Sequence, residues 1–212
     1  MPAEPQIHRL PTAAAGDTAV VHHLTELINT VYDDAESALW QEEVARTDTD
    51  EVAASIAAGQ IIVARLGRSG EENGSGDGQR DSGGPQSGER GSGSDDPPGA
   101  IIGVVQAHAT DGRGWFGMLA VDSGSRSAGI GRRLVGGAED LAREAGATEI
   151  EISVIMTTDE SFAPKVELAA WYQRLGYELA EVVSVAESIP GMEDLLAVDC
   201  HMQILRKTLS TK

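Results

Sequence analysis

Apolar residues recur along this chain in two ways, as short unbroken runs and at steps of three and four positions. The runs predict strands at 6–10, 61–64, 100–108, 114–121, 148–155, 178–185 and 201–206. The stepped pattern predicts helices at 17–32, 51–58, 129–145 and 164–175, and a short helical turn at 192–196. Because strands and helices alternate over most of the chain, the pattern is typical of the α/β class.

The junction between the strand at 114–121 and the helix at 129–145 has a distinctive composition. It reads Arg126-Ser127-Ala128-Gly129-Ile130-Gly131. A glycine-rich turn at the start of a helix points several backbone N–H groups at one place, and the helix dipole adds positive potential there. Arg126, Arg132 and Arg133 gather here although the chain has a formal net charge of -18. The turn therefore predicts a binding site for a phosphate-bearing ligand.

This turn resembles the acyl-CoA signature of the GNAT superfamily of N-acyltransferases, which is Arg or Gln, two residues, Gly, one residue, then Gly or Ala. Arg126, Gly129 and Gly131 fill the three defined positions. Further along, Trp171-Tyr172-Gln173-Arg174-Leu175-Gly176-Tyr177 resembles a second feature of the family, which is an aromatic residue and Tyr, then three residues, then Gly and an aromatic residue. The resemblance covers residues 100–180 well, and the order of the elements supports it over the rest of the chain.

The resemblance implies the GNAT acyltransferase fold, a mixed, mostly antiparallel central sheet of about seven strands flanked by helices. It also implies acetyl-CoA as the co-substrate. The pantetheine arm would then pair with backbone groups of Leu119, Ala120 and Val121. The pyrophosphate would contact backbone N–H groups of the turn, which are those of Arg126, Ser127, Ala128, Gly129, Ile130, Gly131 and Arg132.

Two residues are candidates for proton transfer. By resemblance, Tyr172 lies near the thioester sulfur and protonates the departing thiolate, since a phenol with a reference pKa of about 10 is neutral at pH 7. Glu151 points to the opposite face from Ile150 and Ile152 and is the candidate general base. A paired surface carboxylate, a basic role for His108 and a role for water alone are the alternatives. Many family members carry Asn where this chain has Lys165.

The stretch at about 68–98 is rich in Gly, Ser and Asp and contains almost no apolar residue. Such a composition buries too little surface to offset the entropy cost of ordering it, so we expect a disordered insertion. The part that precedes it has too few elements for a core of its own. We therefore expect a single N-acetyltransferase domain over 1–212, with the insertion between two adjacent strands near Ile61 and Ile101, rather than a linker between two domains.

Composition narrows the partners and the compartment. The acidic balance argues against nucleic-acid and anionic-membrane partners, which require basic patches. The single cysteine, Cys200, excludes an internal disulfide and is typical of a reducing compartment. Without a membrane-length apolar run or a signal-peptide pattern, we expect a cytoplasmic protein, monomeric or homodimeric. His, Cys and Asp show no metal-ligand spacing, so no metal is expected.

The expected acceptor is a small-molecule or peptidyl amine. In the GNAT fold its site is walled by the first helices and by a connection near the C-terminus. In this chain those segments carry Trp40 and a set of carboxylates, which are Asp33, Asp34, Glu36, Glu42, Glu43, Glu187, Glu193 and Asp194. Carboxylates at a cleft mouth favour a cationic amine, and a solvated acidic face is the other interpretation.

Two other functions stay open at this point. A non-catalytic GNAT-like module would bind CoA as a sensor or serve a partner. A dinucleotide-binding oxidoreductase would use Gly129 and Gly131 with Glu151 about 20 residues later. However, Leu134 replaces the third glycine of that fingerprint, and residues 122–128 separate the strand from the glycines.

Overall fold

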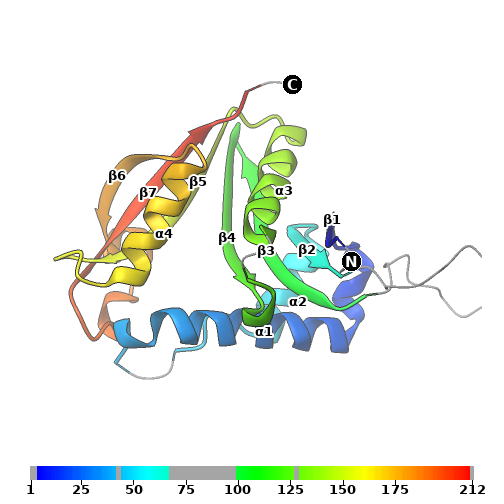
Figure 1. Cartoon of the computed structure of the whole chain (residues 1–212), viewed down its shortest axis with the longest axis horizontal. Coiled ribbons are helices and arrows are strands. Elements are labelled where there is room, and N and C mark those ends of the chain that lie inside the picture. Colours follow the sequence, from blue (N-terminus) through cyan, green and yellow to red (C-terminus); the bar gives the residue numbers. More distant parts are fainter. Residues whose placement is uncertain (1–3, 42–43, 67–98, 127–128, 211–212) are drawn as a thin grey trace, which may run out of the picture.

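The structure is a computed structural model that describes residues 4–41, 44–66, 99–126 and 129–210. The predicted insertion at 68–98 lies outside the described residues. The described part forms one sheet in the order β1-β2-β3-β4-β5-β7-β6. Its strands are β1 (Gln6–Arg9), β2 (Ile61–Arg65), β3 (Ile101–Thr110), β4 (Arg113–Val121), β5 (Glu149–Thr157), β6 (Glu178–Ser184) and β7 (Cys200–Thr208). All neighbours are antiparallel except β4 and β5, which confirms the mixed, mostly antiparallel sheet (Figure 1).

The strands that precede and follow residues 67–98 pair directly with each other. In β2 and β3, Ile61 is opposite Gln106 and Ile62 is opposite Val105. The N–H of Leu66 donates to the carbonyl of Ala100 at 3.0 Å, so these two residues lie side by side. The predicted pairing of these strands is therefore confirmed, and the single-domain organisation stays a prediction.

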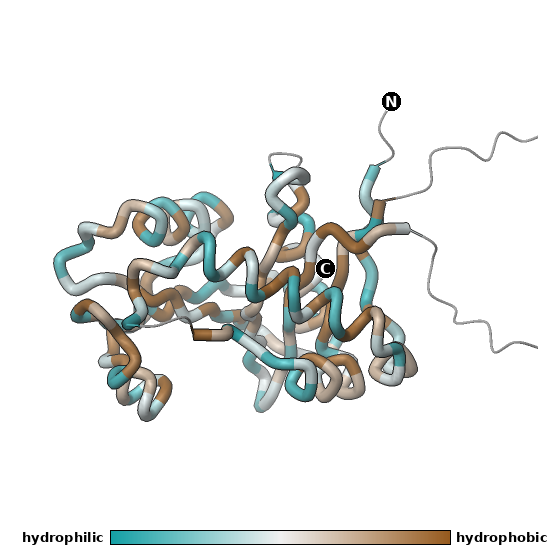
Figure 2. The backbone as a smooth tube through the Cα atoms, turned by 90° about the horizontal axis from the view of Figure 1, so that it is seen from below, coloured by the Kyte–Doolittle hydropathy of each residue, from teal (hydrophilic) through white to brown (hydrophobic). Residues whose placement is uncertain are grey.

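The helices cover both faces of the sheet. They are α1 (Thr18–Glu36), α2 (Thr49–Ala57), α3 (Ile130–Glu144), α4 (Ala163–Arg174) and the short α5 (Val185–Ser188). On one face α3 and α4 pack with Phe116 and Ile150, while α1 and α2 pack on the other with Val63 and Val104. In Figure 2 apolar and polar positions alternate along the helices, as expected for helices that cover a sheet on one side.

Helix α1 is the element whose end the sequence pattern misplaced. Asp17 caps the start of this helix, because its carboxylate accepts the N–H groups of Ala19 and Val20 at 3.0 and 3.3 Å. The helix continues beyond the predicted end at Tyr32, through polar residues, to Glu36. This last turn carries Glu36 into the interior, where it is 6% exposed.

Candidate active site

The sheet opens between its two parallel strands. Strands β4 and β5 pair at Arg113↔Glu149, Gly114↔Ile150 and Trp115↔Glu151. Beyond these pairs, within the described chain, the strands diverge toward their carboxyl ends and leave a V-shaped gap (Figure 1). A cavity of about 1030 Å³ lies there, lined by β4, β5, α1, α4 and the segment after α1. The gap allows a ligand to enter from the α3 and α4 side and meet a second ligand from the α1 side.

A strained residue marks the β4 wall of this cavity. Met118 has φ 48°, a left-handed conformation that costs a non-glycine residue roughly 1–3 kcal/mol. The register of β3 and β4 shifts at the same place, since Val104 is opposite Ala120 but Gln106 is opposite Gly117. This bulge reverses the alternation, so that Phe116 packs toward α3 and Met118 toward α1. No sequence signal indicated the bulge, because methionine does not favour this conformation.

The bulge also decides how the predicted pantetheine residues lie. Leu119 and Val121 line the cavity, on the side of α3 and α4. Ala120 is 1% exposed and packs toward α1, and it does not line the cavity. Because β4 and β5 do not pair here, backbone groups of this stretch are accessible to an extended arm, in the manner of an added strand.

The glycine turn begins α3 at the mouth of the cavity. Gly129 is the residue before the helix, with φ 73° and ψ 10°, a conformation that glycine adopts without steric cost. The first N–H groups of a helix have no partner within it, so those of Ile130, Gly131 and Arg132 are available to an anion. The Ile130 side chain is buried, and a Cβ at Gly131 would lie 3.7 Å from the Trp171 ring. Ser127 and Ala128 lie outside the described residues.

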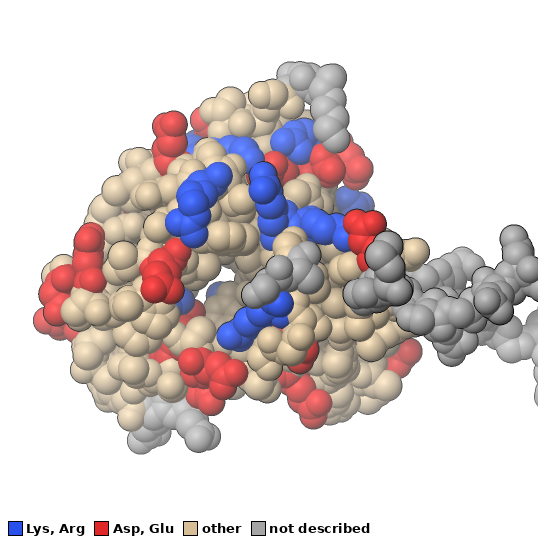
Figure 3. Space-filling model, viewed as in Figure 1, with Lys and Arg blue, Asp and Glu red and all other residues tan. Residues whose placement is uncertain are grey.

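Arg126 lines the cavity next to this turn. Figure 3 shows a central hollow on the face that carries α3 and α4, with Lys and Arg side chains gathered around its upper side. Asp and Glu lie to the left of the hollow and below it. Basic side chains thus gather on one side of the hollow, in a chain with a formal net charge of -18.

Tyr172 lies inside the cavity on α4. It is 3% exposed, and its ring lies 5.8 Å from that of Phe116 and 4.9 Å from that of Trp171. Burial, with a smaller contribution from nearby Tyr32, raises the pKa of Tyr172 above its ordinary value. The phenol therefore keeps its proton at neutral and alkaline pH, which is the form that a proton donor needs.

A buried ion pair crosses the cavity. Lys165, in the first turn of α4, contacts the carboxylate of Glu36 at the end of α1, and their side chains are 7% and 8% exposed. Lys165 and Tyr172 are seven residues apart, so both face the cavity from the same side of α4. This pair could not be predicted from the sequence, because its members lie 129 positions apart and neither belongs to a motif.

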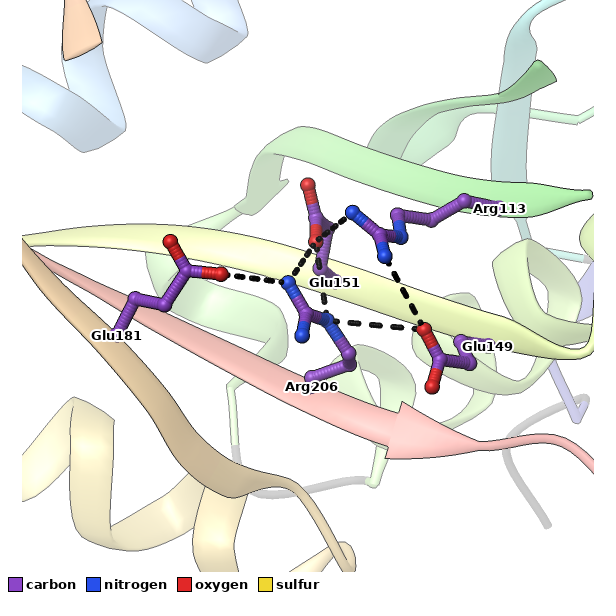
Figure 4. Close-up of polar contacts among 5 residues, drawn as sticks. All are labelled: Arg113, Glu149, Glu151, Glu181 and Arg206. Carbon is purple, nitrogen blue, oxygen red and sulfur yellow. Dashed lines mark hydrogen bonds and ion pairs between the residues drawn. The ribbon is translucent and has the colours of Figure 1, made fainter. Parts of the chain in front are cut away.

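Glu151 lines the cavity but is already paired. Figure 4 shows its carboxylate between two arginines. Arg206 donates to it from Nη2 at 3.1 Å and from Nε at 3.3 Å, and Arg113 lies 3.9 Å away. Arg206 also contacts Glu181 at 3.1 Å. Both arginines already contact this carboxylate, which supports the paired-carboxylate interpretation. His108 stacks on Trp115 at 5.1 Å instead of lining the cavity.

Two segments that are distant in the sequence contact each other at one end of the cavity. The N–H of Gln41 donates to the carbonyl of Leu195 at 2.9 Å, and the N–H of Ala197 donates to that of Leu39 at 2.8 Å. Trp40, which lines the cavity, forms a bridge to Leu196 within this contact. The tie holds the segment after α1 against the β6–β7 connection.

The predicted acidic wall is only partly at the cavity. Of its described members, Asp33 and Glu36 line it. Glu187 accepts from Ser184 to cap α5, and Glu193 accepts the N–H of Gly191 at 3.0 Å. Glu42 and Glu43 lie outside the described residues. The structure thus gives little support to an acidic acceptor site.

The family comparison agrees with this geometry. Residues 93–179 match the family described as "Acetyltransferase (GNAT) domain". Over these residues, which are fewer than half of the chain, the sequence matches a GNAT acetyltransferase domain. The match spans the glycine turn and the segment that ends at Gly176 and Tyr177, which are the two motifs that suggested the family. A comparison with curated proteins found no match.

Solved structures share the fold of this acetyltransferase domain at low sequence identity. The protein yncA from Salmonella typhimurium, with its cofactor acetyl-CoA, is 14% identical at a TM-score of 0.57, covering 99% of this chain and 96% of its own. Aminoglycoside 6'-acetyltransferase type Ii is 15% identical at 0.56, covering 98% and 99%. N-acetylglutamate synthase from Neisseria gonorrhoeae, complexed with coenzyme A and N-acetyl-glutamate, is 15% identical at 0.55, covering 100% and 36%.

Two observations on the described residues concern metals and membranes. In this part of the acetyltransferase, no group of three or more His, Cys, Asp and Glu is arranged to hold a metal ion. Among the helices described, none combines the length and the apolar character needed to cross a bilayer. The expected compartment and oligomeric state stay predictions.

Proposed function

We propose that this acetyltransferase moves an acetyl group from acetyl-CoA to the nitrogen of an amine acceptor. The observation that carries the proposal is the gap between β4 and β5, where one cavity extends from Arg126, next to the glycine turn, to a chamber beside α1. An acetyl-CoA arm in this gap would present its thioester at the junction of the two chambers. An amine from the α1 side would reach the same point, as transfer requires.

The residues of the gap suggest a role for each wall. Backbone groups of 119–121 would pair with the pantetheine arm, and the N–H groups at the start of α3 would bind the pyrophosphate, with Arg126 beside them. Gly129 and Gly131 allow close approach of phosphate, because neither carries a Cβ. The positive φ of Met118 reorients the adjacent peptide groups of β4, which would place an N–H donor at the thioester carbonyl.

Transfer then proceeds by attack of the amine nitrogen on the thioester carbon. The carbon–sulfur bond breaks, the sulfur takes the proton of the Tyr172 hydroxyl, and the nitrogen loses one proton to water, which then returns a proton to the Tyr172 oxygen. Because burial raises the pKa of Tyr172, the phenol is a weak acid and we expect a contribution at the lower end of roughly 10²–10⁴-fold. Water is the proposed base, since two arginines already pair with the Glu151 carboxylate.

Ligand-dependent melting and CoA release test the proposal. At about 100 times its dissociation constant, acetyl-CoA should add about 2.7 kcal/mol to the free energy of unfolding, while NAD should add nothing. Release of CoA thiol in the presence of a panel of amines should exceed the rate with acetyl-CoA alone. Stabilisation by NAD would favour the oxidoreductase alternative. Stabilisation by acetyl-CoA with no amine-dependent release would favour the sensor module.

A further inference from the structure

Among the described residues, three of the charges that line the cavity are held in ion pairs, and Asp33, Arg46 and Arg126 are outside these pairs. Within the described residues, the charged lining consists of Asp33, Glu36, Arg46, Arg126, Glu151 and Lys165. Glu36 pairs with Lys165, and Glu151 pairs with Arg206 and Arg113. Arg126 stands at the entrance on the α3 side. In the acceptor chamber Arg46 therefore remains as a cation for which the described chain supplies no carboxylate partner.

Arg46 is held in place by a contact of its side chain and by hydrogen bonds to the next residue. The guanidinium carbon lies 5.2 Å from the centre of the Tyr32 ring, and Tyr32 also lines the cavity. The next residue, Thr47, is clamped by the Asn29 side chain of α1. Its N–H donates to Asn29 Oδ1 at 3.0 Å, and its carbonyl accepts from Asn29 Nδ2 at 2.9 Å. Two hydrogen bonds across 18 residues fix the backbone from which Arg46 extends.

This arrangement suits an anion with two oxygens. The Arg46 side chain also donates a hydrogen bond to the Tyr32 side chain, and the spacing of the remaining guanidinium N–H groups matches a carboxylate. The fixed backbone and the ring lower the entropy cost of holding the arginine in place. Asp33 is the other charge that faces this chamber, and it lies at the exposed rim.

We propose that Arg46 binds a carboxylate on the acceptor, so that the substrate class is an amine that also carries a carboxylate group. This inference rests on the proposed transfer reaction and deepens it. With the carboxylate on Arg46, the amine is directed toward the gap where the thioester is expected. The inference replaces the cationic amine expected from the acidic residues, since the charge of Glu36 is neutralised by Lys165.

Product binding tests the inference without requiring turnover. N-acetylglycine, N-acetylalanine and N-acetylglutamine are titrated by calorimetry into the full chain with CoA, each beside its carboxamide. We expect the acids to bind roughly 10- to 100-fold more tightly than the amides, as a charge-assisted bidentate contact allows. Arg46→Gln should abolish this difference and leave the amides unchanged. Arg46→Lys should keep part of the difference, since lysine retains the charge but lacks the paired N–H groups of a guanidinium.

A matched control is Arg9→Gln. Arg9 is exposed and pairs with Glu144 at 3.3 Å, away from this chamber, so its loss should leave the acid preference intact. In turnover, Arg46→Gln should raise the KM for carboxylate acceptors about 10- to 100-fold with little change in kcat. A purely structural role would instead lower the melting temperature and shift acids and amides together.

The outcomes separate this inference from the proposed reaction. Equal binding of acids and amides by the wild type, absence of binding by both, or an acid preference that survives Arg46→Gln overturns the inference. Amine-dependent CoA release alongside such a result leaves the transfer reaction standing. If the protein does not bind CoA, the transfer reaction fails, and the same titrations without CoA still decide the role of Arg46.

Discussion

The buried pair of Glu36 and Lys165 allows a prediction with a magnitude. The Lys165→Met substitution keeps the length of the side chain and removes its charge, which leaves the Glu36 carboxylate buried without a cation. Removing one partner of a buried pair costs about 3–5 kcal/mol. For a chain of this size each kcal/mol shifts the melting temperature by about 2–4 °C, so we expect a fall of roughly 6–20 °C.

The double variant Glu36→Leu with Lys165→Met distinguishes the cost of an orphaned charge from the loss of a favourable contact. Replacing both partners with apolar groups removes the desolvation cost of both charges, so the double variant should recover most of the stability. Scanning calorimetry on the two single variants and the double variant measures this coupling. Breaking the exposed pair of Arg9 and Glu144 with Arg9→Gln is the control and should cost at most about 1 kcal/mol.

Two results would refute the reasoning. A melting temperature of Lys165→Met within about 2 °C of the wild type would mean that water reaches Glu36 and the pair is not buried in solution. A double variant as unstable as the sum of the singles would mean that packing, and not charge, is the cause.

Three further predictions concern the glycine turn, the proposed acid Tyr172 and the segment at 68–98. Gly131→Val should weaken acetyl-CoA binding, measured by calorimetry, with little loss of stability. Gly129→Val should also destabilise the fold, because Gly129 has a φ of 73°. Wild-type affinity in a folded Gly131→Val variant would contradict the proposed phosphate site at the glycine turn. Tyr172→Phe should lower kcat and leave CoA affinity unchanged. Because the pKa of Tyr172 is raised, its ionisation should not lower the kcat of the wild type between pH 8 and about 10. An unchanged kcat in Tyr172→Phe, with chemistry rate-limiting, would make Tyr172 a packing residue. Replacing residues 68–98 by a short Gly/Asn turn should preserve solubility and activity, since Leu66 and Ala100 are already hydrogen-bonded at 3.0 Å; loss of soluble protein or of CoA binding would show that the segment contributes to the fold.

Local signals in the sequence were sufficient for the order of the elements and for the entrance of the site. Periodicity of apolar residues is a property of neighbours along the chain, so the seven strands and four main helices could be predicted from it. The glycine turn is also local, because Gly129 is both a motif residue and the left-handed residue before α3. The aromatic motif placed Tyr172 on α4, and the fold then buried it in the cavity.

The arrangement of the chamber beside α1 could not be predicted from such local signals, because its contacts join residues far apart in the chain. Glu36 meets Lys165 across 129 residues, Glu151 meets Arg206 across 55, and the Gln41 side chain reaches the Leu196 carbonyl across 155. A carboxylate in a list of acidic residues carries no sign of its partner, so Glu36 was predicted to attract a cationic acceptor although Lys165 neutralises it. Likewise, the gap between β4 and β5 and the bulge at Met118 depend on how seven strands share twist and register. Residues that are neighbours along the chain were enough to predict the elements and the glycine turn, whereas the pairing of Glu36 with Lys165 and of Glu151 with Arg206 depends on contacts that only the folded chain forms.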